Sequence, residues 1–489
     1  MQKVQAELAD DSAEIDATGE ALRFPESQLR QLANWGGDSQ LSAAEALMWR
    51  METLPQGSSA GTSLHFLAST PSWEDVCDFV DGLSKAVPRL RQCVHELGVG
   101  QLPVWRDDQN FQVGEHLRRL SLPQNSGNDV LISALSDFAN TPTEMQRPPW
   151  EVLFVDGLAG NKSVFALKIQ HCLTDGGGLI QLFSAALSER SDCQLRGSAQ
   201  SLTALAPAAR YKRVLMPSPG KMIKSGFKVW QKHRDEGYSL TSAQRYLKSI
   251  QSLNAAQASK GSRLLQQRSA TNRYDLLNLP LPTLKLLAKA AQASLNDVYL
   301  ALIIGAFRRY HLAFGVDDEA SLPLAFPVSL RKPGDAVGGN QFTGVSYASP
   351  LNIADPQERI SVIRAFVRGA RAEPALDFMN QLLPVAMLLP IKLTAKLVAQ
   401  YSSRLDVQVS NIPGMARSAY LAGALVESHY VLPPRPGCAC MFAMISHQDV
   451  AGIALNYDPA AVREPKLLLS CVSDEFAGLC AYFDIEALV

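Results

Sequence analysis

Residues 163–178, SVFALKIQHCLTDGGG, are the most informative stretch of the sequence. Their first part has the composition of a β-strand, so the odd-numbered residues from Phe165 to His171 are expected on one face. Gln170 would then point to the opposite face. His171 stands where the strand ends, which is a rigid place to hold a catalytic base. The glycines that follow let a ligand approach the backbone closely, and they open a helix expected at 178–188.

Asp175 follows His171 by four residues, and Gly176 and Gly177 come next. The Asp175 carboxylate can turn back to fix the loop or a buried cation. The alternative is purely structural: His171 is an ordinary histidine at a strand end, and Asp175 only caps the next helix. The pattern H-x-x-x-D-G is too short to decide between these interpretations, so the rest of the chain must.

Strands and helices alternate on both sides of this stretch, which predicts an α/β (α+β) fold. Two strands at 151–156 and 163–171 are separated by turn residues, as in a hairpin. Further strands are expected at 62–68, 322–330, 404–410, 440–446 and 451–457, and helices at 41–53, 73–86, 283–291 and 295–312. Ser42 and Glu45 are spaced to form a capping box at the start of the first helix.

The 489 residues divide into four predicted segments. Residues 1–38 are expected to be a disordered acidic tail, because residues 1–20 carry six acidic side chains and no apolar core of a signal peptide. Residues 39–191 form an N-terminal domain and residues 271–489 a C-terminal domain of similar size. Between them, residues 192–270 have no strand signals and few aromatic residues, which indicates a helical crossover.

Several short motifs resemble those of one enzyme family. His171 to Gly176 resembles the HHxxxDG motif of the wax ester synthase/diacylglycerol acyltransferase family, within the CoA-dependent acyltransferases. Other family motifs occur in the same order, at Leu41–Thr53, Pro148–Glu151, Asn296–Val298, Pro327–Arg331 with Gly339–Asn340, and Ser410–Gly414. The resemblance extends from about residue 41 to about residue 485. Gln170 departs from it, because the family has its first histidine there; Pro149 and Met415 also differ from the usual residues.

The resemblance implies two chloramphenicol-acetyltransferase-like domains with a tunnel at their interface. It implies transfer of a long-chain acyl group from acyl-CoA to a fatty alcohol or diacylglycerol, with no metal or prosthetic group. His171 would be the general base, Asp175 would support its loop, and Asn296 would stabilise the oxyanion, although Asn296 or Ser294 could equally cap a helix. The substrate-binding residues would be Gly176, Gly177, Trp150, Asp297, Asn340 and Asn411.

The proposed chemistry suits these side chains. An alcohol that attacks a thioester must lose its proton, and a neutral imidazole accepts it well near pH 7. No nucleophilic side chain is needed, because the alcohol attacks directly. Cys172 is adjacent to His171, but its side chain is expected to point away. Two rival functions remain: acyl transfer to another lipid or polyketide alcohol, and a non-catalytic lipid-surface protein of the same fold.

Charge and hydropathy restrict the partners. The chain has 46 basic and 47 acidic residues, so nucleic acid is not an expected partner. Eight scattered cysteines without a C-x-x-C pair indicate thiols in a reducing compartment. The apolar run at 382–389 meets prolines and lysines, and it is not expected to cross a membrane. A cytoplasmic protein is expected, peripherally associated with the inner membrane face or with lipid inclusions.

A basic amphipathic helix is expected within 210–234, which has eight basic residues and no acidic one. Lys221, Lys224, Lys228 and Lys232 would form its charged stripe, with an apolar stripe opposite. Three interpretations are open: the helix lies on an anionic lipid surface, it faces the phosphates of CoA, or it packs on the protein with a solvated lysine face.

Overall fold

The computed structural model describes residues 24–54, 59–98, 101–197, 248–249, 261–269, 271–318, 321–329, 338–340, 342–373, 383, 387 and 389–486. All structural statements below concern these residues. Residues 1–23, most of the predicted crossover and the basic segment 210–234 lie outside them.

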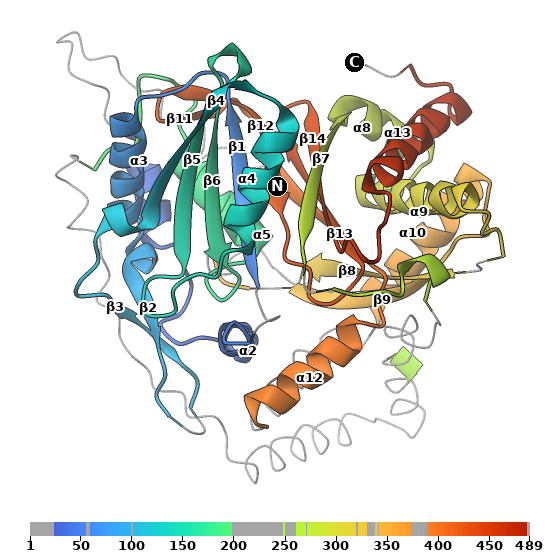
Figure 1. Ribbon diagram of the computed structural model, residues 1–489, viewed down its shortest axis with the longest axis horizontal. Helices are drawn as coiled ribbons and strands as arrows, with labels where there is room; N and C mark the ends of the chain where they lie inside the picture. Colours follow the sequence, from blue (N-terminus) through green and yellow to red (C-terminus); the bar gives the residue numbers. More distant parts are fainter. Residues whose placement is uncertain are drawn as a thin grey trace, which may run out of the picture.

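The first of two large sheets is built mainly from the N-terminal half (Figure 1). Its strand order is β11-β12-β1-β6-β5-β4. The strands are β1 (Ala60–Leu67), β4 (Leu117–Ser126), β5 (Trp150–Leu158), β6 (Ser163–Gln170), β11 (Tyr420–Leu421) and β12 (Ala424–Leu432). The predicted hairpin of β5 and β6 is confirmed, and β6 also pairs antiparallel with β1.

Helices cover both faces of this sheet. Phe165, Leu167 and Ile169 of β6 belong to one hydrophobic core, together with α3 (Trp73–Ala86) and α5 (Gly176–Ala186). The alternate residues of β6 belong to a second core with α4 (Asn128–Asn140). The predicted two-faced character of the strand before His171 is therefore confirmed. A small separate sheet pairs β2 (Gln92–His95) with β3 (Val104–Asp107).

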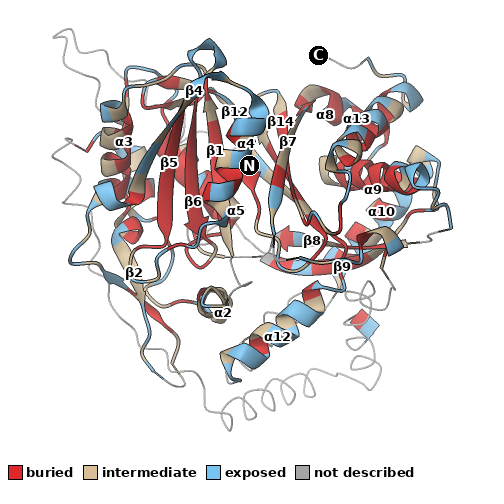
Figure 2. Ribbon diagram, in the orientation of Figure 1, coloured by how far each residue is buried: buried red, intermediate tan, exposed pale blue. Residues whose placement is uncertain are grey.

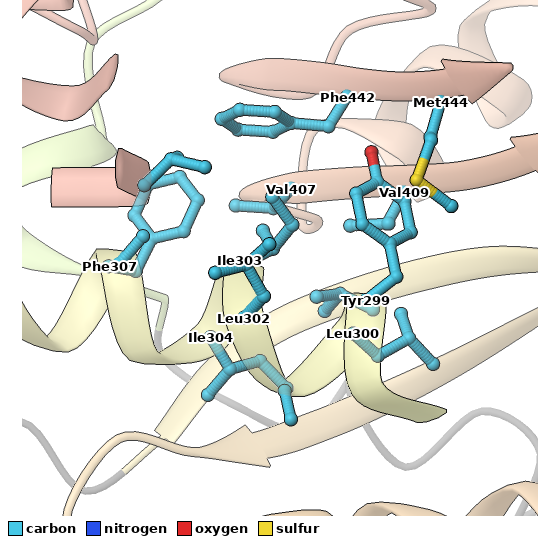
Figure 3. Close-up of a cluster of buried hydrophobic side chains, with 14 of the residues drawn as sticks. Tyr299, Leu300, Leu302, Ile303, Ile304, Phe307, Val407, Val409, Phe442 and Met444 are labelled. Atoms are coloured by element: carbon cyan, nitrogen blue, oxygen red, sulfur yellow. The ribbon is translucent and has the colours of Figure 1, made fainter. Parts of the chain in front are cut away.

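The second large sheet has the order β7-β14-β13-β10-β8-β9. Its strands are β7 (Arg273–Pro280), β8 (Ser321–Ser329), β9 (Phe342–Pro350), β10 (Val407–Met415), β13 (Cys440–His447) and β14 (Val450–Tyr457). Its helices are α8 (Leu281–Ala290), α9 (Leu295–Ala313), α10 (Pro356–Ala372) and α13 (Pro465–Tyr482). The central helix α9 presents Tyr299, Ile303 and Phe307 to Val409 and Phe442 of the sheet (Figure 3).

The two halves of the chain share a sheet. β11 and β12 come from residues 420–432, yet they extend the N-terminal sheet, with β12 paired antiparallel to β1. β12 also contacts β13 and β14 of the second sheet. β11 and β12 join the two halves into one body. The predicted domain boundaries place them in the C-terminal domain and do not anticipate this pairing.

Residues 24–38 do not belong to an acidic tail, contrary to the sequence-based expectation. They form α1 (Glu26–Ala33) and a turn that buries Leu32 and Trp35, which are 0% and 4% exposed. The indole Nε1 of Trp35 donates a hydrogen bond to the carbonyl of Gly178 in α5, at 2.8 Å. Apolar side chains recur every three residues in this segment and form the buried face of α1. The prediction of an acidic tail gave weight to the acidic residues that precede α1 and overlooked this pattern.

Two further helices lie at the lower edge of the molecule in Figure 1, α2 (Ala43–Met51) and α12 (Ile391–Ser402), and they contact one another. The predicted capping box of Ser42 and Glu45 is present in α2. No single helix of the described ranges meets the length and hydropathy needed to cross a membrane, whereas α8 and α9 meet them together across a 98° bend. Most of α9 is buried in the core of the second sheet.

Candidate active site

His171 lies directly after β6, at the end where the two halves of the chain meet. Its backbone N–H donates to the carbonyl of Ser59 at 3.3 Å, and its own carbonyl accepts a hydrogen bond from the Asn340 side chain. Its side chain is half-buried, so the ring is fixed at its base and remains accessible. This is the placement expected of a base that must reach a substrate.

The tautomer of His171 follows from one hydrogen bond. Its Nδ1 lies 3.0 Å from the carbonyl oxygen of Thr174. A carbonyl oxygen can only accept, so Nδ1 carries the hydrogen in the neutral ring. In that tautomer Nε2 carries the lone pair. The loop thus prepares the atom that a general base uses.

Asp175 is the N-cap residue of α5. Its Oδ1 accepts a hydrogen bond from the backbone N–H of Gly178 at 2.8 Å, and its side chain is buried. Its own N–H donates to the carbonyl of Gly339. Asp175 therefore ties the loop after His171 both to α5 and to the segment 338–340 that comes from the other half.

The segment 338–340 is bound to α2 through Glu45. The Glu45 Oε1 atom accepts hydrogen bonds from the backbone N–H and the side-chain amide of Asn340, at 3.2 and 3.3 Å. The other oxygen of Glu45 completes the capping box with the N–H of Ser42. Of the predicted substrate-binding residues, Asn340 is the one that donates a hydrogen bond to the backbone of His171.

A second acidic residue, at the C-cap of α2, supports the other side of His171. Glu52 accepts hydrogen bonds from the backbone N–H and hydroxyl of Ser59, at 2.9 and 3.3 Å. Ser59 in turn accepts from the N–H of His171. Sequence analysis missed Glu52 in this role. The available signal was its position two helical turns after Glu45, on the same face of α2.

The end of β10 approaches the start of α5. Gly176 lies against Ile412, and a Cβ atom at Gly176 would lie only 2.8 Å from the Cδ1 atom of Ile412. Asn411 precedes Ile412 on this strand, so it is near the His171 loop, whereas Gly177 is exposed in the first turn of α5. The absence of a side chain at Gly176 therefore permits close contact between the two halves of the chain. Approach of a ligand to the backbone here stays an expectation.

Asn296 and Asp297 lie at the start of α9, and no hydrogen bond between described residues links them to the His171 loop. Ser294 is the N-cap of α9, and Asp297 completes its capping box. Asp297 also lines a cavity of about 340 Å³ with Arg364, Arg368 and other residues of α9 and α10. The structure thus gives Ser294 and Asp297 contacts at the helix end, and the expected role of Asn296 stays a prediction.

Trp150 is placed in the core rather than on a surface that a substrate could reach. It is 1% exposed, and its indole N–H donates to the carbonyl of Leu90 at 2.7 Å. Its ring stacks on that of His116 with centroids 4.3 Å apart. The expected substrate contact of Trp150 is therefore replaced by a structural role in the first sheet.

The side chains of Cys172 and Gln170 are both buried and contact each other. The Gln170 amide donates to the Thr143 hydroxyl, and the Cys172 thiol lies 3.5 Å from the Gln170 Oε1 atom. Burial raises the pKa of Cys172 well above its usual value, which keeps it a neutral thiol. All eight cysteines are described, and none is in a disulfide bond.

Comparison with known proteins identifies the family. Residues 41–299 match the wax ester synthase/diacylglycerol acyltransferase catalytic domain, and residues 338–479 match the WS/DGAT C-terminal domain. The chain belongs to the wax ester synthase/diacylglycerol acyltransferase family. It is therefore an acyltransferase, and the family resemblance of its motifs is confirmed.

Individual relatives agree with this family assignment. A Mycobacterium tuberculosis protein named as a diacylglycerol O-acyltransferase is 32% identical over 461 residues, which cover 90% of this chain and 92% of the relative. Another relative from that organism with the same activity in its name is 27% identical over 426 residues, covering 82% of this chain and 87% of the relative.

Solved structures confirm the two-domain fold. The wax ester synthase/diacylglycerol acyltransferase from Marinobacter aquaeolei VT8 aligns with a TM-score of 0.62 and 19% identity, covering 91% of this chain and 100% of that chain. The first condensation domain of the CDA synthetase aligns with a TM-score of 0.56 and 13% identity, covering 93% and 99%. The predicted pair of chloramphenicol-acetyltransferase-like domains is the observed fold of this family member.

Metal ligands are not clustered in the described part of this acyltransferase, where no group of three His, Cys, Asp or Glu side chains could hold an ion. That the reaction needs no metal or prosthetic group stays a prediction from the family resemblance. The tunnel between the domains also stays a prediction.

Proposed function

We propose that this acyltransferase moves a long-chain acyl group from acyl-CoA to a fatty alcohol or diacylglycerol, with His171 as general base. The supporting observation is the hydrogen bond from Nδ1 of His171 to Thr174, because in the neutral ring it places the hydrogen on Nδ1 and the lone pair on Nε2. The products would be a wax ester or triacylglycerol and free CoA.

The reaction balances without another reactant. The acceptor hydroxyl gives its proton to Nε2 of His171 as its oxygen bonds to the thioester carbon. The tetrahedral intermediate then collapses, the carbon–sulfur bond breaks, and the imidazolium returns the proton to the CoA sulfur. General base assistance of this kind contributes about 10²–10⁴-fold to a rate. That Asn296 stabilises the oxyanion stays a prediction from the family resemblance.

The test is a substrate panel with a variant of the base. Purified protein is incubated with palmitoyl-CoA and hexadecanol, dioleoylglycerol or a polyketide alcohol, and both thiol release and lipid products are measured. His171→Ala should lose about 99% or more of the rate while its melting temperature is kept. If folded His171→Ala retains more than about a tenth of the rate, His171 is not the base. A preference for the polyketide alcohol would select the rival acceptor class.

We further propose that the enzyme works at a lipid surface on the cytoplasmic side of the membrane or on lipid inclusions. The support is the acid-free basic segment 210–234, whose structure lies outside the described residues. Changing Lys221, Lys224, Lys228 and Lys232 together to Gln should weaken binding to anionic liposomes, most clearly at low salt. If instead KM for acyl-CoA rises with soluble acceptors, the lysines face CoA.

A further inference from the structure

Helix α12 presents a stripe of leucines to solvent. Leu389, just before its first turn, and Leu393 and Leu397 within it are 41%, 45% and 50% exposed. Leu393 and Leu397 are four residues apart and therefore lie on one side of the helix, while Leu389 stands just before the N-cap residue Pro390. Isolated exposed leucines are ordinary, whereas three of them at the start and along one side of a single helix form a surface that water solvates poorly.

The opposite side of α12 is packed on the protein. Ile391 and Val398 pack against the hydrophobic core of the first sheet, and Thr394 is buried. Figure 2 shows the helix with its exposed residues along the lower margin of the molecule. The leucine stripe is therefore held outward by a helix that is anchored along its other face.

Charge on α12 has a single sign. Lys392 and Lys396 are exposed beside the leucines, and the sequence from 378 to 405 contains no acidic residue. Lysines next to an apolar stripe can place their ammonium groups among lipid phosphates while the leucines enter the acyl region. An acid-free helix also meets no repulsion from an anionic surface.

The position of α12 relates this stripe to the active site. α12 contacts α2, whose Glu45 and Glu52 hold Asn340 and Ser59 on the two sides of His171. A surface bound by α12 would therefore lie beside the helix that supports the base. An acceptor dissolved in that surface would have a short route to the site.

We propose that α12 docks the enzyme on an anionic lipid surface through Leu389, Leu393, Leu397, Lys392 and Lys396. This docking role rests on the proposed function only in that the acceptor is a lipid. It concerns α12, which is a different element from the basic segment 210–234. Two other occupants of the stripe, another segment of this chain and a second copy of it, are distinguished by the test.

The test uses full-length protein and binding to vesicles, so it does not depend on turnover. The vesicles contain phosphatidylcholine with about a third phosphatidylglycerol, and bound protein is measured by flotation. The double variant Leu393→Gln/Leu397→Gln should lower the partition coefficient at least about tenfold. Lys392→Gln/Lys396→Gln should lower it mainly at low salt, and little on vesicles of phosphatidylcholine alone.

A matched control is available in the chain. Leu286 of α8 and Leu312 of α9 are exposed to a similar degree, 44% and 43%, but do not belong to the stripe. Leu286→Gln/Leu312→Gln should change vesicle binding less than about twofold. Equal loss in the control and stripe variants would overturn the proposal, because it would show that general surface hydrophobicity controls binding.

Two further outcomes decide against a lipid surface. Undiminished vesicle binding by the stripe variant, with a lowered melting temperature, would assign the stripe to another segment of this chain. Undiminished binding with a smaller oligomer in solution would assign it to a second copy. Activity with octanoyl-CoA and a short soluble alcohol should be unchanged in the stripe variant; failure of the wild type in that assay would count against the proposed function and leave the vesicle result standing.

Discussion

At the scale of single residues, the structure separates two neighbours that the sequence places side by side. His171 and Gln170 are consecutive, yet the ring of His171 turns toward the Thr174 loop and the amide of Gln170 toward Thr143 in the core. Gln170 stands where the family has its first histidine. Because the Gln170 amide is engaged by Thr143, we expect its effect on the chemistry to be indirect.

Gln170→His should therefore change the rate less than about tenfold while lowering stability. The substitution removes the bond to Thr143 inside a buried site, and a lost buried hydrogen bond costs about 1–3 kcal/mol. Activity on soluble substrates and thermal unfolding of the same preparation provide the two measurements. A larger change in rate at unchanged stability would show that position 170 contacts the reacting groups.

Asp175 also has a role that can be tested at the residue scale. Asp175→Asn retains an oxygen that can accept from Gly178 but removes the negative charge at the start of α5. Asn caps a helix as well as Asp does, and a helix-end charge contributes about 0.3–1 kcal/mol, so the melting temperature should fall by only about 1–2 °C. Asp175→Ala, which removes both features, should fall further. A selectively lost rate in a fully stable Asp175→Asn variant would place the carboxylate in the catalytic step.

At the scale of elements, features formed by neighbouring residues could be predicted from the sequence, and pairings between distant segments could not. The capping box of Ser42 and Glu45 and the β5–β6 hairpin are local, and both are confirmed. The pairing of β12 with β1 joins segments more than 300 residues apart, so no local periodicity could have revealed it. For the same reason the contact of Glu45 with Asn340 could not be predicted, although both residues were singled out.

Glu45 links the stability of α2 to the position of the His171 loop, and these two effects can be separated. Glu45→Ala should lower kcat by about tenfold or more, because Asn340 loses its partner and the backbone of His171 is less firmly held. Ser42→Ala is the matched control. It removes the side-chain cap of α2 but leaves the hydrogen bonds that Asn340 donates to Glu45. Equal loss of kcat in the two variants would mean that only the helix matters.

At the scale of the whole molecule, a buried histidine cluster lies where the two sheets meet. His65 of β1 and His429 of β12 stack with centroids 4.2 Å apart, and both face the hydroxyl of Ser63. His447 of β13 lies 3.0 Å from the carbonyl of Val426 in β12. The strands that join the two halves therefore carry three titratable groups with almost no exposure to water.

This cluster predicts a loss of stability in mild acid. Burial is the main cause that lowers the pKa of His65 well below its usual value and that of His429 to about 3. In the unfolded chain both would titrate near pH 6.5. Below about pH 6.5 the unfolded state thus binds protons that the native state does not, so stability falls by about 1.4 kcal/mol per pH unit for each such group.

The melting temperature should accordingly be flat above pH 7 and fall between pH 6.5 and 5, before most carboxylates begin to titrate. Replacing His429 by Gln should lower the melting temperature at pH 7.5 and make its decline with acid shallower, because one of the groups that bind a proton only on unfolding is gone. His95 in β2 is exposed, so His95→Gln should leave the profile unchanged. A wild-type melting temperature constant down to pH 5 would mean that the cluster already carries protons in the folded protein, and that the joint between the two sheets accommodates charge.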